Sequence, residues 1–256
     1  MKELVAIVTG ASSGIGRATA VRLAREFSAV VIAARNGKNL GEVALEIEAA
    51  GAAALPVEID LSLPSAADEL VSRALGSYGR IDSVVNIAGA VPGIDLFDLT
   101  DEQWDAATAL KLHGARRLTL RAWDALKAST GSVVFTSGTA AVTPVAASAA
   151  IGTINAAIEA LAKAFADRGI RDGVQVNTIS PGPVMTGRRQ GLIDKVAGAK
   201  GITSEQAKSK FLEQTGINRF GEPEELAELV AFAVSPNARW MTGSVLRMDG
   251  GETKSV

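Results

Sequence analysis

The chain has 256 residues, of which 47% are hydrophobic and 21% charged, and its formal net charge is -2. This balance excludes disorder, and the absence of cysteine excludes disulfides, thiolate chemistry and cysteine-based metal sites. A single histidine excludes a multi-histidine metal site, and the slightly acidic balance argues against nucleic-acid binding through a basic surface.

Short apolar runs rich in β-branched residues alternate with amphipathic stretches along the chain. The runs predict buried strands at residues 4–8, 29–33, 53–58, 83–87, 132–136 and 174–179, and a last short strand at 245–248. The amphipathic stretches predict helices at residues 14–26, 38–50, 65–77, 101–127, 148–168 and 223–234. This alternation predicts an α/β fold in one domain, a doubly wound parallel sheet of about seven strands between two helical layers.

Residues 187–216 depart from this rhythm, because they follow a Pro/Gly-rich turn and carry many charges. A long segment beyond the carboxyl end of a strand is where this kind of fold places elements that cover a ligand. We therefore predict a substrate lid here, with a solvated helical excursion as the alternative. The N-terminal sequence has no secretory pattern, and no window approaches 18 consecutive apolar residues, so we expect a cytoplasmic protein without a membrane span.

The first predicted strand runs into the sequence TGASSGIG and then into a helix. Glycines at positions 10, 14 and 16 permit a tight turn and a close approach of backbone to a pyrophosphate. The following helix directs free N–H groups and the positive end of its dipole at the phosphates. The strand before the loop and the helix after it are the context that dinucleotide binding requires.

The spacing of these glycines, after a threonine, resembles the signature of the short-chain dehydrogenase/reductase family. Further matches follow in order: Asp60-Leu61, the segment 86–89 (NIAG), the turn 180–186 (SPGPVMT), the segment 219–225 (RFGEPEE) and the C-terminal elements at 242–251. The resemblance implies a dinucleotide site formed by Gly10, Ser12, Ser13, Gly14, Ile15, Gly16, Arg35, Asn36, Asp60, Leu61, Asn86, Ala88, Gly89, Asn155, Pro181, Gly182, Val184 and Thr186.

The end of the second strand indicates which nucleotide is bound. A site that prefers NAD usually has an acidic residue there for the ribose 2′-hydroxyl, but here the strand is followed by Arg35 and Asn36. The guanidinium of Arg35 suits a 2′-phosphate. We therefore expect NADP(H), with NAD possible because Ser13 stands where the family often has a second basic residue.

Family members usually carry catalytic Ser, Tyr and Lys residues, together with an Asn on an earlier helix. The tyrosine moves the proton at the carbonyl oxygen, the lysine lowers its pKa and the serine binds the oxygen. Aligned residue by residue, these four places hold Gly138, Ile151, Asn155 and Lys111. The usual proton-transfer mechanism therefore cannot be carried over.

Candidate substitutes for the family's missing serine, tyrosine and lysine are the hydroxyls of Ser137 and Thr139 and the amine of Lys111. Each of them also has an ordinary structural interpretation. Asn155 could bind a ribose hydroxyl without tuning a pKa. The only tyrosine, Tyr78, lies in a turn before the fourth strand, and the only histidine, His113, is expected in the core or an interface.

Two hypotheses remain open. The chain is either an oxidoreductase that transfers hydride without the usual acid, or a catalytically inactive NADP(H)-binding protein that acts as a sensor, regulator or partner subunit. A lyase or isomerase that uses Lys111 is a third, weaker idea. The resemblance also implies a homodimer or homotetramer. From composition and charge we expect neither nucleic acid nor a membrane as a partner.

Overall fold

The computed structural model describes residues 3–254 and contains a parallel seven-stranded sheet in the order β3-β2-β1-β4-β5-β6-β7. The strands are β1 (Val5–Thr9), β2 (Ala29–Ala34), β3 (Ala53–Glu58), β4 (Ser83–Asn86), β5 (Ser132–Thr136), β6 (Gln175–Pro181) and β7 (Val245–Met248). This order confirms the predicted doubly wound sheet. The strand order reverses between β1 and β4, and there the loops at the carboxyl ends of the strands diverge and leave a crevice.

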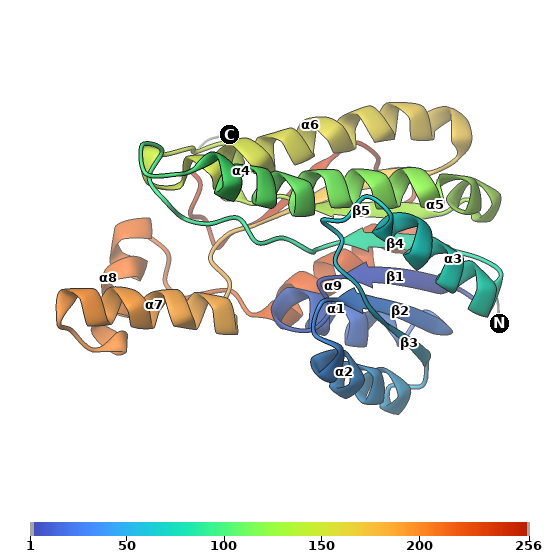
Figure 1. Cartoon of the computed structure of the whole chain (residues 1–256), viewed down its shortest axis with the longest axis horizontal. Coiled ribbons are helices and arrows are strands. Elements are labelled where there is room, and N and C mark those ends of the chain that lie inside the picture. The colour runs from blue at the N-terminus through green and yellow to red at the C-terminus, as the bar shows by residue number, and fades with distance from the viewer. Residues whose placement is uncertain (1–2, 255–256) are drawn as a thin grey trace.

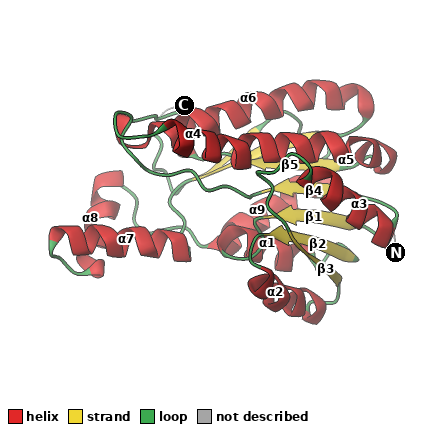
Figure 2. Cartoon of the chain, viewed as in Figure 1, coloured by secondary structure: helices red, strands yellow, loops and turns green. Residues whose placement is uncertain are grey.

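Helices cover both faces of the sheet, and the two layers are visible in Figures 1 and 2. One layer consists of α1 (Gly14–Leu23), α2 (Gly37–Ala49) and α9 (Pro223–Val234), and the other of α3 (Ala66–Tyr78), α5 (Ala115–Ser129) and α6 (Ala149–Asp172). Strand β1 serves both cores, because successive side chains point to opposite faces. Ile7 packs into the core beneath α5 and α6, whereas Ala6 and Val8 pack into the core beneath α1 and α9.

The stretch Ala146–Asp172, which includes α6, has the length and mean hydropathy (1.2) of a membrane span. Helix α6 packs against β5 and β6, and Ile158 and Phe165 belong to the core. A central core helix meets the same criteria of length and composition, so this stretch is weak evidence for a membrane segment.

The predicted continuous helix over 101–127 is wrong in its interior. Helix α4 (Asp101–Thr108) is followed by a π-helical turn at Ala109–Gly114, and α5 begins after it. At Gly114 an added Cβ would lie 2.8 Å from the carbonyl oxygen of Leu61, so this backbone passes close to the loop after β3. The sequence periodicity of a helix does not report such a local change in winding.

Three further boundaries or environments differ from the predictions. Helix α1 ends at Leu23 rather than at 26, and α6 continues to Asp172, where Gly173 ends it with a φ of +73°. Strand β3, predicted to be buried, is fully buried only at Val57, because it lies at the edge of the sheet. Pro56 in its middle is tolerated at such an edge.

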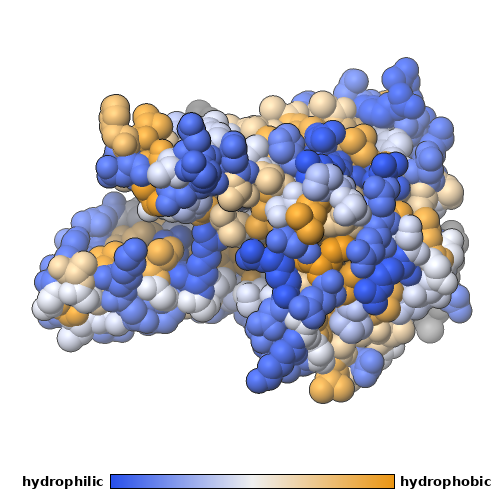
Figure 3. Space-filling model, in the orientation of Figure 1, coloured by the Kyte–Doolittle hydropathy of each residue, from blue (hydrophilic) through white to orange (hydrophobic). Residues whose placement is uncertain are grey.

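Residues 187–216 form α7 (Gly187–Lys200) and α8 (Ser204–Thr215), which project from the body beyond the end of β6 (Figure 1). The two helices pack on each other through Ile193, Ala197 and Ala207, and Phe220 from the loop after α8 completes this small cluster. The surface is hollowed between this arm and the opposite helical layer (Figure 3). The arm is therefore helical and flanks a hollow, while its role as a lid remains a prediction.

Candidate functional site

The glycine-rich loop folds tightly between β1 and α1. Gly10 has a φ of +67°, and an added Cβ would lie 2.9 Å from the backbone of Ala88, while a Cβ on Gly16 would lie 2.1 Å from the carbonyl oxygen of Gly10. Thr9 ties the loop to the next strand, since its Oγ1 accepts hydrogen bonds from the backbone N–H groups of Ile87 (3.0 Å) and Ala88 (3.1 Å). Ser13 forms no side-chain cap, so it leaves the first N–H groups of α1 to a ligand.

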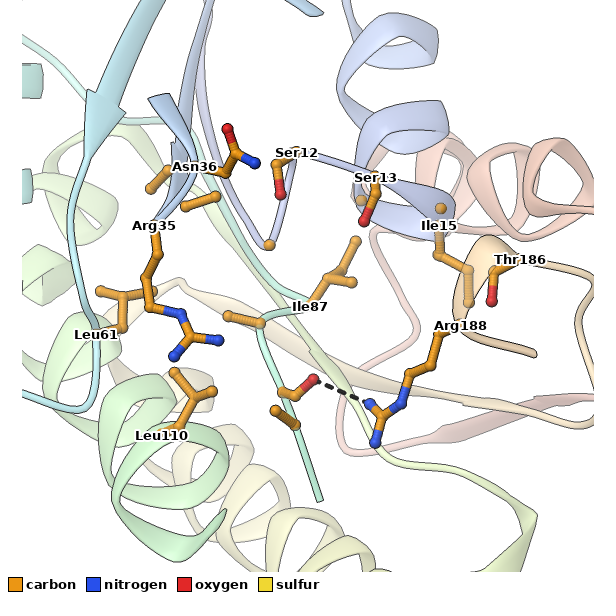
Figure 4. Close-up of a pocket in the computed structure, with 18 of the residues that line it drawn as sticks. Ser12, Ser13, Ile15, Arg35, Asn36, Leu61, Ile87, Leu110, Thr186 and Arg188 are labelled. Atoms are coloured by element: carbon orange, nitrogen blue, oxygen red, sulfur yellow. Dashed lines mark hydrogen bonds between the residues drawn. The ribbon is translucent and has the colours of Figure 1, made fainter. Parts of the chain in front are cut away.

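A cavity of about 730 Å³ opens beside this loop at the reversal of strand order. The predicted nucleotide residues that line it are Gly10, Ser12, Ser13, Gly14, Ile15, Gly16, Arg35, Asn36, Leu61, Ala88, Gly89 and Thr186. Figure 4 shows Arg35 and Arg188 extending into it from opposite sides. Glycine backbone without side chains, a free helix N-terminus and an arginine at each side fit the phosphates of a dinucleotide.

Six predicted nucleotide residues do not line this cavity. Asp60 accepts the N–H of Ser62 (2.9 Å), and this bond, aided by the charge of Arg35, lowers the pKa of the carboxyl. The amide of Asn86 donates to Thr119 Oγ1 (3.2 Å) inside the core. Of the others, Asn155 lies in α6, Pro181 ends β6, and Gly182 and Val184 lie in the turn after it.

Arg188 is a residue that the sequence reasoning missed. Its guanidinium donates to the carbonyl oxygens of Gly89 (3.3 Å) and Val91 (2.6 Å), so the start of α7 is tied across the cavity to the loop after β4. Thr186 caps the same helix by accepting the N–H of Arg189 (3.2 Å). No sequence signal marked Arg188, since its role depends on how α7 is placed. The other cavity residues that were not predicted are Ala33, Ala34, Ile59, Ile87, Ala90, Leu110 and Gly187.

Lys111 and Asn155 form one hydrogen-bonded pair although they are far apart in sequence. The Lys111 amine donates to Asn155 Oδ1 (2.5 Å) and to the carbonyl oxygen of Ser137 (3.3 Å). Asn155 is buried, whereas the Lys111 side chain lies deep in the protein but keeps some exposure. Burial, together with the charge of Arg188, lowers the pKa of Lys111 to about 8.

The two other replaced positions carry no polar side chain. Gly138 follows β5, and an added Cβ there would lie 2.9 Å from Asn155 Nδ2, so the glycine makes room for the asparagine. Ile151 packs against the small apolar cluster that contains Val91 and Ile154. Neither position offers a proton donor.

The hydroxyls that were considered as substitutes are already engaged with carboxylates. Ser137 Oγ donates to Glu159 Oε1 (2.7 Å), and Thr139 Oγ1 donates to Glu252 Oε2 (2.9 Å). These contacts favour the structural interpretation of both hydroxyls over a role in binding substrate.

Neither Tyr78 nor His113 lines the cavity. Tyr78 ends α3 and packs on the core, where burial raises its pKa. Tyr78 therefore lies at the amino ends of the strands, since α3 leads into the start of β4, whereas the cavity lies at their carboxyl ends. Burial and the charges of Arg116 and Arg117 lower the pKa of His113.

Comparison with known proteins places these features in context. A family model described as enoyl-(acyl carrier protein) reductase matches residues 10–253. The short-chain reductase protein NovJ of Streptomyces niveus is 32% identical over 251 residues, which cover 98% of this chain and 94% of the relative. L-sorbose reductase of Gluconobacter frateurii, solved with NADPH and L-sorbose, has a TM-score of 0.95 and 29% identity, covering 100% of this chain and 98% of that one. An actinorhodin polyketide ketoreductase variant solved with NADPH has a TM-score of 0.93 and 29% identity, covering 99% and 98%.

Proposed function

Because the chain belongs to the short-chain dehydrogenase/reductase family of oxidoreductases, we propose that it binds NADP(H) and transfers a hydride to or from a small molecule. The observation that carries this proposal is the cavity of about 730 Å³, walled by the glycine-rich loop and reached by Arg35 and Arg188. When bound there, the nucleotide would supply the hydride chemistry, and the residues around the cavity would orient it.

Arg35 supports NADP(H) over NAD(H). It follows β2 directly, at the place where an acidic residue would hold the 2′-hydroxyl of NAD, and it lines the cavity. Its planar guanidinium suits a 2′-phosphate. The L-sorbose reductase and the polyketide ketoreductase, which share this fold, were both solved with NADPH.

Titration of NADPH and NADH, followed by the fluorescence of the reduced nicotinamide, tests the nucleotide assignment. Arg35→Asp is expected to weaken NADPH binding by about tenfold or more, since a charge-assisted hydrogen bond to the 2′-phosphate is lost and a repulsion is added. NADH should be affected much less. Arg171→Asp, an exposed charge reversal on α6, is the matched control. Equal losses for the two nucleotides would contradict the role of Arg35.

The reaction itself is tested by NADPH oxidation in the presence of a panel of carbonyl compounds and imines. Substrates that need little proton donation, such as an already cationic imine, suit a site in which Gly138 and Ile151 replace polar groups. No oxidation above the blank with any member of the panel would count against hydride transfer.

The second candidate is an inactive NADP(H)-binding protein, a sensor, regulator or partner subunit. It is favoured by the apolar packing of Ile151 at the place of the family's tyrosine. In that case nucleotide binding persists without turnover, and a partner captured by pull-down responds to NADP(H). The combined variant Gly138→Ser, Ile151→Tyr and Asn155→Lys tests whether the pocket otherwise supports carbonyl reduction. Asn155 and Gly138 must be substituted together, because the two positions are in contact.

Self-association is proposed as well, as a homodimer or homotetramer. The edge strand β7 exposes Val245 and Met248, which an identical chain could cover. Light scattering coupled to size-exclusion chromatography measures the mass directly, and a monomer across the micromolar range would overturn this proposal.

A further inference from the structure

Lys111 is a deep amine without a carboxylate partner. Among the ion pairs between residues 3 and 254, none includes it, and its two hydrogen bonds go to the neutral oxygens of Asn155 and Ser137. A buried cation of this kind is unfavourable unless a function or an anion compensates for it. It also lies in the π-helical turn, a kind of irregularity that is frequent at functional sites.

The aliphatic stem of Lys111 lies directly behind one end of the nucleotide cavity. The stem of Lys111 passes Gly89, where an added Cβ would come within 3.0 Å of Lys111 Cδ, and Gly89 lines the cavity. In this fold the ribose next to the adenine is held at the end of the second strand, here near Arg35, and the pyrophosphate at the first helix. The opposite end, formed by Gly89, Thr186 and Arg188, is therefore left to the nicotinamide.

The charged groups around the amine come from several elements. Arg188 of α7 acts on it through its charge. From α6, Asn155 is neutral and the carboxylate of Glu159 is bonded to Ser137 Oγ. From the segments that follow β5 and β4, the neighbours Ser137 and Gly89 are neutral. On its own helical segment, His113 interacts with Arg116 and Arg117 instead.

We propose that Lys111 is the acid–base residue of the hydride-transfer reaction and that Asn155 positions its amine. In the reducing direction an N–H bond of the Lys111 ammonium breaks, and its proton forms an O–H or N–H bond on the substrate, whose carbon receives the hydride of NADPH. The neutral amine then regains a proton from solvent. The lowered pKa of Lys111, about 8, suits this exchange near neutral pH. This inference rests on the proposed function.

A consequence can be measured without a substrate. The oxidised nicotinamide ring is positively charged and the reduced ring is not, so NADP⁺ should disfavour the charged form of Lys111 and NADPH should not. NADP⁺ binding then releases a proton from Lys111, and its affinity rises with pH relative to that of NADPH. A further pKa decrease of about one unit predicts a rise of about sevenfold in this ratio between about pH 6.5 and pH 9. The ratio cancels the titration of the 2′-phosphate, which both nucleotides carry.

The experiment compares the dissociation constants of NADP⁺ and NADPH by isothermal titration calorimetry across this pH range. The wild-type ratio should change by about sevenfold, whereas Lys111→Met and Lys111→Arg should show a flat ratio, since neither side chain titrates there. Lys210→Met, at an exposed lysine of α8, should behave as wild type. A flat wild-type ratio, or the same slope in Lys111→Met, overturns the role of Lys111.

A second measurement needs no variant. Competitive acetylation followed by peptide mass spectrometry gives the pKa of Lys111 in the wild-type chain, free and with each nucleotide. A pKa that NADP⁺ lowers and NADPH leaves unchanged supports the proposal, and one that neither nucleotide changes overturns it. Binding of both nucleotides with no pH-dependent ratio refutes this inference alone, whereas the absence of any binding refutes the proposed function with it.

Discussion

The Lys111→Met substitution should change how the stability of the folded protein depends on pH. Methionine keeps much of the length of the lysine side chain and removes its charge, so the apolar packing against Gly89 is largely retained. The hydrogen bonds to Asn155 and Ser137 are lost, and this loss opposes the gain from removing a buried charge. Whether the variant is more or less stable at a single pH is therefore less informative than how the difference in stability changes with pH.

The trend follows from the pKa of Lys111, which falls from 10.5 to about 8 on folding. Each unit corresponds to about 1.36 kcal/mol, so the charged amine destabilises the folded state by about 3 kcal/mol when both states are protonated. The unfolded state binds more protons between these two pKa values, so wild-type stability rises with pH in that window. By about pH 9.5, roughly 2 kcal/mol of the destabilisation is removed.

Urea unfolding of wild type and Lys111→Met, at about pH 7 and pH 9.5, measures this difference. Between these conditions the wild type should gain about 2 kcal/mol relative to the variant, because the titration of all other groups is common to both proteins. Lys210→Met is the control, since its exposed amine should show no such trend. Parallel pH dependence in wild type and Lys111→Met would refute the argument that the amine is held in an unfavourable environment.

Two further predictions concern the residues around this amine. Gly138→Ala should lower the free energy of unfolding by about 1 to 2 kcal/mol, since the new Cβ would meet Asn155 Nδ2 at 2.9 Å. The same change made in an Asn155→Ala background should have a smaller effect, and equal effects in the two backgrounds, measured by urea unfolding, would disprove the contact. Arg188→Leu removes two hydrogen bonds that tie α7 to the loop after β4, so local opening of residues 187–200 should become about fivefold to tenfold more frequent. Hydrogen exchange followed by mass spectrometry checks this, and unchanged exchange in α7 would show that the two hydrogen bonds of Arg188 do not control its local opening.

The strands and the phosphate loop could be predicted because their determinants are local. The apolar run before Gly10 and the spacing of the three glycines define a strand, a turn and a helix within about a dozen residues. Strand β3 was placed correctly in sequence, but its exposure depends on its position at the sheet edge, which the run itself does not encode.

The contacts at the centre of the site could not be predicted in the same way. Sequence comparison identified Lys111 and Asn155 as replacements, but only the fold brings the amine to the carbonyl oxygen of the asparagine side chain. The direction of Lys111 depends on the π-helical turn, and the reach of Arg188 depends on how α7 leaves the body. Each is a tertiary relation between segments that are distant in the chain.

The π-helical turn at Ala109–Gly114 also affects how this protein tolerates change. Such a turn is equivalent to one residue inserted into an α-helix. Because of the insertion, the helix before the turn and the helix after it can each present a different face to their neighbours. Helix α4 contacts α6, whereas α5 contacts α3 and the sheet. A deletion of one residue within the turn would restore regular α-helical winding there, so Lys111 would lose its present direction toward Asn155 while α5 could keep its own packing. Length variation at this point therefore offers a route by which the helical layer keeps its packing while the chemistry of the cavity changes.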